Sequence, residues 1–117
     1  MKIAGKVWGH TKEIIKGSAF EVHRIEINKG GFCSLHKHNH KNNAFFVESG
    51  IVEVEVHKND YDLVDKTKLI VGEMVIVKAG ENHRFKGIED SIVYEIYWLD
   101  DINDDIVRIE VGGDEKN

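Results

Sequence analysis

Hydrophobic and polar residues alternate along much of this chain with a period of two. In residues 51–57, three valines share one face of an extended chain and two glutamates share the other. This alternation is typical of a half-buried β-strand, and no stretch carries a helical stripe longer than about two turns. Further strands are predicted in β-rich runs at residues 20–27, 32–38, 44–48, 69–77 (broken by Gly72), 92–99 and 106–111.

Turn signals rich in glycine and asparagine separate these runs. Strands spaced about 8–12 residues apart, in a chain without proline, predict an antiparallel sandwich or a small barrel. Because short strands must avoid exposed edges, we expect a closed barrel and a homodimer that shares strands across its interface. The 117 residues suit one domain, expected at 6–111, with a polar tail at 112–117.

Composition narrows the choice of partners. The net charge is −5 and the basic residues do not cluster, so nucleic acid is not an expected partner. The apolar runs are too short for a membrane span, and the N-terminus lacks the apolar segment and cleavage site of a signal peptide. The single cysteine, Cys33, excludes an internal disulfide and favours a reducing compartment. We therefore expect a cytoplasmic protein.

Three of the seven histidines lie within five residues. On a strand, His36 and His38 point to the same face, whereas Cys33 points to the other and is interpreted as a small buried hydrophobe. His40 keeps this parity only if the strand continues. Converging imidazoles are natural ligands for zinc, manganese, iron, nickel or copper. The alternative is a polar stripe that faces water.

Two segments resemble the two sequence motifs of the cupin family. The first contains Gly30, His36-x-His38 and Gly50 at the family's spacing, with Asn43 at the position of the family's glutamate. The second runs from Gly72 through Ala79-Gly80 to His83, again at the family's spacing. The proline and the asparagine of the second motif are replaced here by Lys78 and Gly87.

The resemblance implies an all-β fold, the cupin double-stranded β-helix or jelly-roll barrel, with a divalent metal at its mouth. The implied ligands are His36, His38, Asn43 and His83. Since an amide oxygen is neutral, it binds a divalent ion more weakly than a carboxylate does. Three outcomes stay open: a three-histidine site completed by water, a site that His40 joins, and a vestigial site without metal.

A narrower resemblance, over about residues 6–110, is to the cupin of type II mannose-6-phosphate isomerases, which also forms the C-terminal domain of mannose-1-phosphate guanylyltransferases. It is carried by Lys6–Gly9, by Ser34-Leu35 with the histidines that follow, by His83-Arg84 and by Asp104–Arg108. The chain departs from that family's pattern at Asn43, at Phe45, at His23 and in the absent terminal motif.

That resemblance implies carbohydrate metabolism, with a sugar or sugar phosphate as substrate. Aldose–ketose isomerisation needs a Lewis acid and a base, and His40 and Glu95 are the candidate bases. Arg24, Lys41 and Arg84 are the candidate cations for a phosphate. The alternatives are a non-catalytic carbohydrate-binding cupin and a dioxygenase with iron on three histidines.

Overall fold

Antiparallel β-strands make up the regular structure of this chain. The computed structural model describes residues 3–58, 63–99 and 109–115, and these residues contain no helix. Nine strands lie in the described residues: β1 (Ile3–Lys6), β2 (Gly9–Lys16), β3 (Phe20–Ile27), β4 (Asn42–Ser49), β5 (Val52–His57), β6 (Val64–Leu69), β7 (Met74–Val77), β8 (Asn82–Gly87) and β9 (Ser91–Trp98). The predicted all-β class is therefore confirmed.

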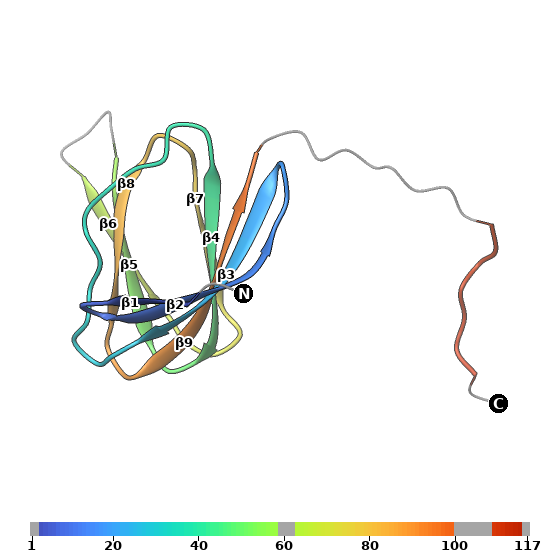
Figure 1. Cartoon of the computed structure of the whole chain (residues 1–117), viewed down its shortest axis with the longest axis horizontal. Coiled ribbons are helices and arrows are strands. Elements are labelled where there is room, and N and C mark those ends of the chain that lie inside the picture. The colour runs from blue at the N-terminus through green and yellow to red at the C-terminus, as the bar shows by residue number, and fades with distance from the viewer. Residues whose placement is uncertain (1–2, 59–62, 100–108, 116–117) are drawn as a thin grey trace.

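The strands form two sheets that face each other (Figure 1). The larger sheet has the order β1-β2-β3-β9-β4-β7, and the smaller one has the order β6-β5-β8. Two isolated bridges, Phe32 with Lys86 and His36 with His83, bring the segment before β4 to the free edge of β8. Strands far apart in the sequence thus become neighbours, which is the arrangement of a jelly-roll sandwich.

The core lies between the two sheets and follows from the alternation along each strand. Val52 and Val54 of β5 are fully buried, whereas the glutamates between the core valines remain partly exposed. Phe45, Val47 and Val93 fill the space from the larger sheet, and Phe85 fills it from β8. Each of these side chains loses its contact with water, which is the main source of stability for a domain of this size.

Several predicted strands are confirmed. The run 20–27 coincides with β3, and the runs at 44–48, 51–57 and 92–99 match β4, β5 and β9 to within a few residues. The run 69–77 is interrupted as expected. Gly72 has a φ of +84°, a left-handed conformation that glycine adopts without a Cβ clash, and the chain turns there from β6 into β7.

The prediction of a continuous strand at residues 32–38 was wrong. From Phe32 to His36 the chain advances four residues, while the partner strand advances only three, from Lys86 to His83. The extra residue breaks the ladder as a β-bulge does, so only isolated bridges remain. The end of the last predicted run was also wrong: residues 109–111 form no strand, and 106–108 lie outside the described residues.

Strands β1, β2, β6 and β8 were not predicted from the sequence, and of β6 only the last residue, Leu69, lies in a predicted run. Strand β2 reads GHTKEIIK, in which charged residues interrupt any alternation, and all four residues of β1 are exposed. These two strands form a hairpin that depends on the pairing of β2 with β3. No helix within the described ranges is long and apolar enough to cross a bilayer.

Candidate metal centre

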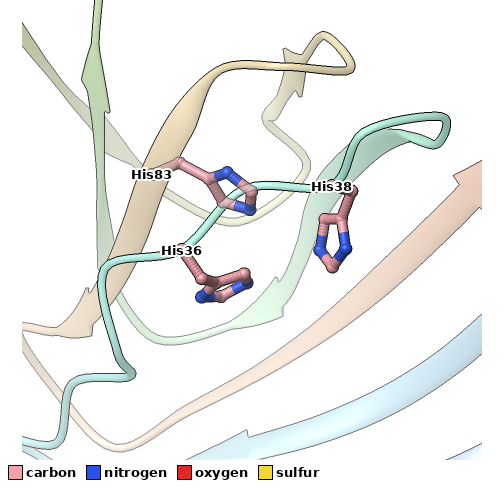
Figure 2. Close-up of side chains that lie close together, drawn as sticks. All are labelled: His36, His38 and His83. Carbon is pink, nitrogen blue, oxygen red and sulfur yellow. The ribbon is translucent and has the colours of Figure 1, made fainter.

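Three histidine side chains meet between the two sheets (Figure 2). His83 comes from β8, and His36 and His38 come from the segment that precedes β4. The ring centroids lie 4.6 Å apart for His36–His83, 5.1 Å for His36–His38 and 5.5 Å for His38–His83. One nitrogen of each ring lies within 4.8 Å of the others. Two ligands of one ion with bonds of about 2.1 Å lie up to ~4.2 Å apart, so small side-chain movements suffice for coordination.

Backbone and side-chain hydrogen bonds hold two of the rings in the ligand tautomer. The amide nitrogens of His36 and His83 donate to each other's carbonyls, at 3.1 and 2.8 Å. His36 Nδ1 donates to the carbonyl of Ser34 (2.8 Å), and His83 Nδ1 donates to the carbonyl of Glu81 (2.9 Å). A carbonyl oxygen only accepts, so the proton of each ring is on Nδ1 and the lone pair is on Nε2. This is the second-sphere arrangement seen around metal-binding histidines.

Unsatisfied polar atoms mark the same place. Among the described residues, four buried side-chain nitrogen or oxygen atoms have no hydrogen-bond partner: His38 Nε2, Asn43 Oδ1, His83 Nε2 and Arg84 Nε. Three of them belong to the four residues implied as metal ligands. Since an unpaired buried polar atom costs about 1–3 kcal/mol, such a group needs a partner. Imidazole nitrogen and amide oxygen can both coordinate a divalent ion, so these residues fit a metal.

Burial favours the neutral, ligating form of the histidines. It lowers the pKa of His38 to about 4, with His36 as a further cause, and it lowers the pKa of His83. A protonated imidazole has no lone pair to donate, so the lowered pKa values keep both rings ready for a cation at neutral pH.

Asn43 lies inside the sandwich on β4 and is 1% exposed. Its Nδ2 donates to Glu95 Oε2 at 3.4 Å, while its Oδ1 receives no hydrogen bond. The amide therefore presents its oxygen as the free group. With three imidazoles and this amide, the ligating groups carry no formal charge.

A second polar cluster lies on the inner face of the larger sheet. Tyr97 Oη donates to Glu95 Oε2 at 2.7 Å, and His23 on β3 pairs with Glu95 across the strands. His23 Nε2 lies 3.1 Å from Glu21 Oε2. The Tyr97 ring is 5.1 Å from the ring of His38, which joins this cluster to the histidines. Burial raises the pKa of the Glu95 carboxyl, although Tyr97 and Asn43 oppose the shift.

A cleft of about 610 Å³ connects the two clusters to the outside. His36, Glu95 and Tyr97 line it, and the β1–β2 hairpin contributes Lys6 and Trp8 to its wall. The Trp8 ring packs edge-on against Phe85 with centroids 4.8 Å apart, which anchors the hairpin to the core. The volume lies within the range of about 300–1,000 Å³ usual for small-molecule sites.

The structure brings some of the predicted residues together and separates others. His36, His38, Asn43, His83 and Glu95 all face the interior. His40 is exposed in the turn before β4 and does not join the histidine cluster.

The three predicted phosphate-binding cations lie in different places. Arg24 is on the outer face of the larger sheet, near Glu26 (3.7 Å) and Glu48 (3.8 Å). Lys41 lies 4.6 Å from the centroid of the Tyr97 ring and 3.9 Å from Glu21, and it lines a small separate hollow. Arg84 borders the cleft, with its guanidinium 5.6 Å from the centroid of the Phe32 ring.

Sequence reasoning missed Tyr97, His23 and Glu21 as members of the site. The alternation along β9 does point to the tyrosine. Val93, Glu95 and Tyr97 lie on one face of the strand, and Val93 is a core residue, so this face points into the sandwich. The same alternation places His23 on the face of β3 that carries the core residues Ile25 and Ile27. Its place beside Glu95 depends on the pairing of β3 with β9, about 70 residues later in the chain.

Comparison with known families matches residues 23–99 to the family described as the cupin domain. This span includes both histidine-bearing segments and Glu95. The segment Asp104–Arg108, which resembles a mannose-6-phosphate isomerase motif, lies outside the described residues. A comparison with curated proteins finds no match.

Solved structures of similar fold belong to several kinds of protein. KdgF from Halomonas sp. has a TM-score of 0.73 at 16% identity, over 86% of this chain and 90% of that chain. The capsular polysaccharide assembling protein CapF from Staphylococcus aureus has 0.72 at 22%, over 88% and 29%. Oxalate decarboxylase from Lactobacillus farciminis has 0.72 at 20%, over 84% and 31%. The chain spans about a third of the last two, and identities this low show a shared fold alone.

Proposed function

Since this chain belongs to the cupin domain family, we propose that it is a metal-dependent enzyme that interconverts an aldose and a ketose, with a sugar or sugar phosphate as substrate. One observation carries the proposal. Three of the four unsatisfied buried polar atoms in the described residues belong to His38, Asn43 and His83. His38 and His83 form one cluster with His36. One member of that cluster, His36, lines a cleft together with the partly buried carboxylate of Glu95.

The two clusters have complementary roles in this reaction. The histidines and Asn43 would hold a divalent ion, which would supply Lewis acidity toward a sugar carbonyl and its neighbouring hydroxyl. Glu95 takes the proton from the carbon beside the carbonyl and returns it to the former carbonyl carbon, while the proton of the neighbouring hydroxyl passes to the former carbonyl oxygen. Tyr97 holds the carboxylate by its 2.7 Å hydrogen bond. We assign the base to Glu95 rather than to His40, because His40 is exposed and outside the cluster.

The carbohydrate assignment is supported by the narrower sequence resemblance and by the fold shared with CapF, a capsular polysaccharide assembling protein. Two other uses of the same site are compatible with a cluster of three histidines. One is carbohydrate binding without turnover, and the other is oxygen chemistry with iron.

A pair of measurements tests the proposal. Metal analysis of the purified protein is expected to find about one divalent ion per chain. Mannose 6-phosphate incubated with the loaded protein is expected to give fructose 6-phosphate by NMR. Bound metal without turnover would favour the binding module, and iron with oxygen uptake would favour the dioxygenase. A protein that binds no divalent ion would contradict the proposal altogether.

We propose further that the protein is a homodimer, formed through the outer face of its larger sheet. One-sided antiparallel sheets usually present polar residues to water. Here the outward positions of β3, β9, β4 and β7 are mainly apolar, and we call them the outer apolar face: Phe20, Val22, Phe46, Met74, Ile76, Tyr94, Ile96 and Trp98. At the border of this face, Arg24 lies near Glu26 and Glu48 of its own chain and offsets part of their negative charge. This weakens the repulsion between two acidic chains that meet there. A two-fold axis brings such a patch onto itself.

Phe46→Glu is expected to convert the dimer into a monomer, because it places a charge in the centre of this apolar surface. Light scattering after size exclusion measures the mass against the 13.4 kDa of one chain. Lys66→Glu, on the exposed face of the smaller sheet, is the control and keeps the mass of the unmodified protein. An unmodified protein that elutes as a monomer at micromolar concentration would refute the proposed interface.

A further inference from the structure

We infer that the cleft takes its ligand by an anionic oxygen group, a carboxylate or a phosphate, because the residues that would hold the metal carry no negative charge and the described cleft wall has two cations to one carboxylate. This inference rests on the proposed metal site. It adds the class of ligand, which neither the family nor the histidine cluster by itself determines.

Asn43 presents a neutral oxygen atom to the metal position. The free atom of its side chain is Oδ1, since Nδ2 is engaged with Glu95 Oε2. An amide oxygen has no formal charge, and an ionised carboxylate at the same position would contribute one negative charge. Together with three neutral imidazoles, Asn43 leaves a divalent ion with both of its positive charges. A bound cation is the largest local charge in such a site, so its full charge favours an anion nearby.

The walls of the cleft carry more positive than negative side chains. The chain as a whole has five more acidic than basic residues. Among the described residues that line the cleft, however, Lys6 and Arg84 are two permanent cations, and Glu95 is the only carboxylate. A cleft lined by charge of one sign concentrates ligands of the opposite sign. The local balance therefore opposes the overall charge of the protein and favours an anion.

The two cations of the cleft wall, Lys6 and Arg84, form no close ion pair with a described carboxylate. Within the described ranges, neither Lys6 nor Arg84 has a carboxylate within 4.0 Å, although Arg84 stands opposite Glu55 on the neighbouring strand β5. Arg84 Nε is buried without a partner, and its guanidinium lies beside Phe32, which also borders the cleft. Guanidinium groups bind carboxylate and phosphate through paired hydrogen bonds. Arg84 is thus available at the rim for an anionic group.

The test measures ligand binding to the metal-loaded protein by calorimetry, with mannose, glucuronate and mannose 6-phosphate as probes. We expect at least one of the two charged sugars to bind ten or more times more tightly than mannose. A preference for glucuronate identifies a carboxylate, and a preference for mannose 6-phosphate identifies a phosphate. Equal or tighter binding of mannose, or no binding of either charged sugar, would overturn the inference.

The variant Asn43→Asp separates this inference from the metal site itself. Aspartate has nearly the shape of asparagine, exchanges the Nδ2 donor to Glu95 for an oxygen, and adds one negative charge that a bound divalent ion offsets. It is therefore expected to tighten the binding of Mn²⁺ alone and to weaken the charged sugar about tenfold. Opposite signs of the two effects are the expected signature. A tighter metal with unchanged preference for the charged sugar overturns the inference and leaves the metal site intact.

A second variant protects the test against misfolding of Asn43→Asp. Arg84→Gln lies on the partly exposed side of β8 and is expected to keep Mn²⁺ affinity while the charged sugar binds several-fold more weakly. Unchanged affinity for the charged sugar in this variant would remove Arg84 from the inferred site. Failure of the unmodified protein to bind Mn²⁺ at all would instead refute the proposed function.

Discussion

Replacing His83 by alanine is expected to remove most of the bound divalent ion. His83 is 1% exposed, its Nδ1 is fixed by the carbonyl of Glu81, and its Nε2 has no other partner. Loss of a second-sphere partner alone lowers metal affinity about 10- to 100-fold, so loss of a ligand should lower it by more than about 100-fold. Titration with Mn²⁺ or Zn²⁺, together with metal analysis of the purified variant, measures the effect.

Two further variants make this result interpretable. His36→Ala removes a partly exposed ligand and should reproduce the loss of metal with less disturbance of the core. His40→Ala removes the exposed histidine that does not join the cluster, and it should keep the affinity of the unmodified protein. Loss of metal in His40→Ala, or its retention in both of the other variants, would show that the ion is held elsewhere.

Replacing Glu95 by glutamine is expected to lower kcat for isomerisation by about 10³-fold while the metal remains bound. Glutamine preserves the size of the side chain but cannot take a proton, and a positioned general base contributes about 10²–10⁴-fold to a rate. Glu95 is not one of the residues that hold the ion in the proposed site. Steady-state kinetics with mannose 6-phosphate, alongside metal analysis, separate loss of the base from loss of the cofactor.

Neighbouring residues supply graded controls. Tyr97→Phe removes the 2.7 Å hydrogen bond and leaves the carboxylate in place. Its kcat should fall by about 10- to 100-fold, since a hydrogen bond to a charged group contributes about 1.5–3 kcal/mol. Glu21→Gln changes a carboxylate on the same sheet face that contacts His23 rather than Glu95, and it should have the smallest effect. An equal kcat for Glu95→Gln and the unmodified enzyme would exclude Glu95 as the base.

The strands of the core could be predicted from the sequence because burial on one face imposes a strict alternation. Residues 51–57 contain β5, since apolar side chains stand at every second position from Val52 to Val56. Residues 20–27 are read correctly as β3 from two shorter alternating pairs on opposite faces, Phe20 with Val22 and Ile25 with Ile27. The β1–β2 hairpin has no such alternation. Its strands are held by pairing with β3 and by the packing of Trp8 on Phe85, and neither contact has a local signature.

The segment 32–38 does not form the predicted strand, yet its two histidines converge with His83. A regular strand was expected to put His36 and His38 on one face, and instead the segment has only isolated bridges to β8. The imidazoles nevertheless converge, because the backbone hydrogen bonds between His36 and His83 fix the segment against that strand.

Local sequence specifies the kinds of side chain available and their spacing: two histidines two residues apart, a third in a second motif, and an asparagine where the family has glutamate. These features can be read without knowing the fold. The residues that face the histidines follow instead from how distant strands pair. Glu95, Tyr97 and His23 meet there because β3 and β9 pair across the larger sheet. His40 and Arg24 point elsewhere because a turn and the alternation of a strand direct them outward. The packing of the whole core sets which distant strands pair, and no short sequence motif specifies that pairing.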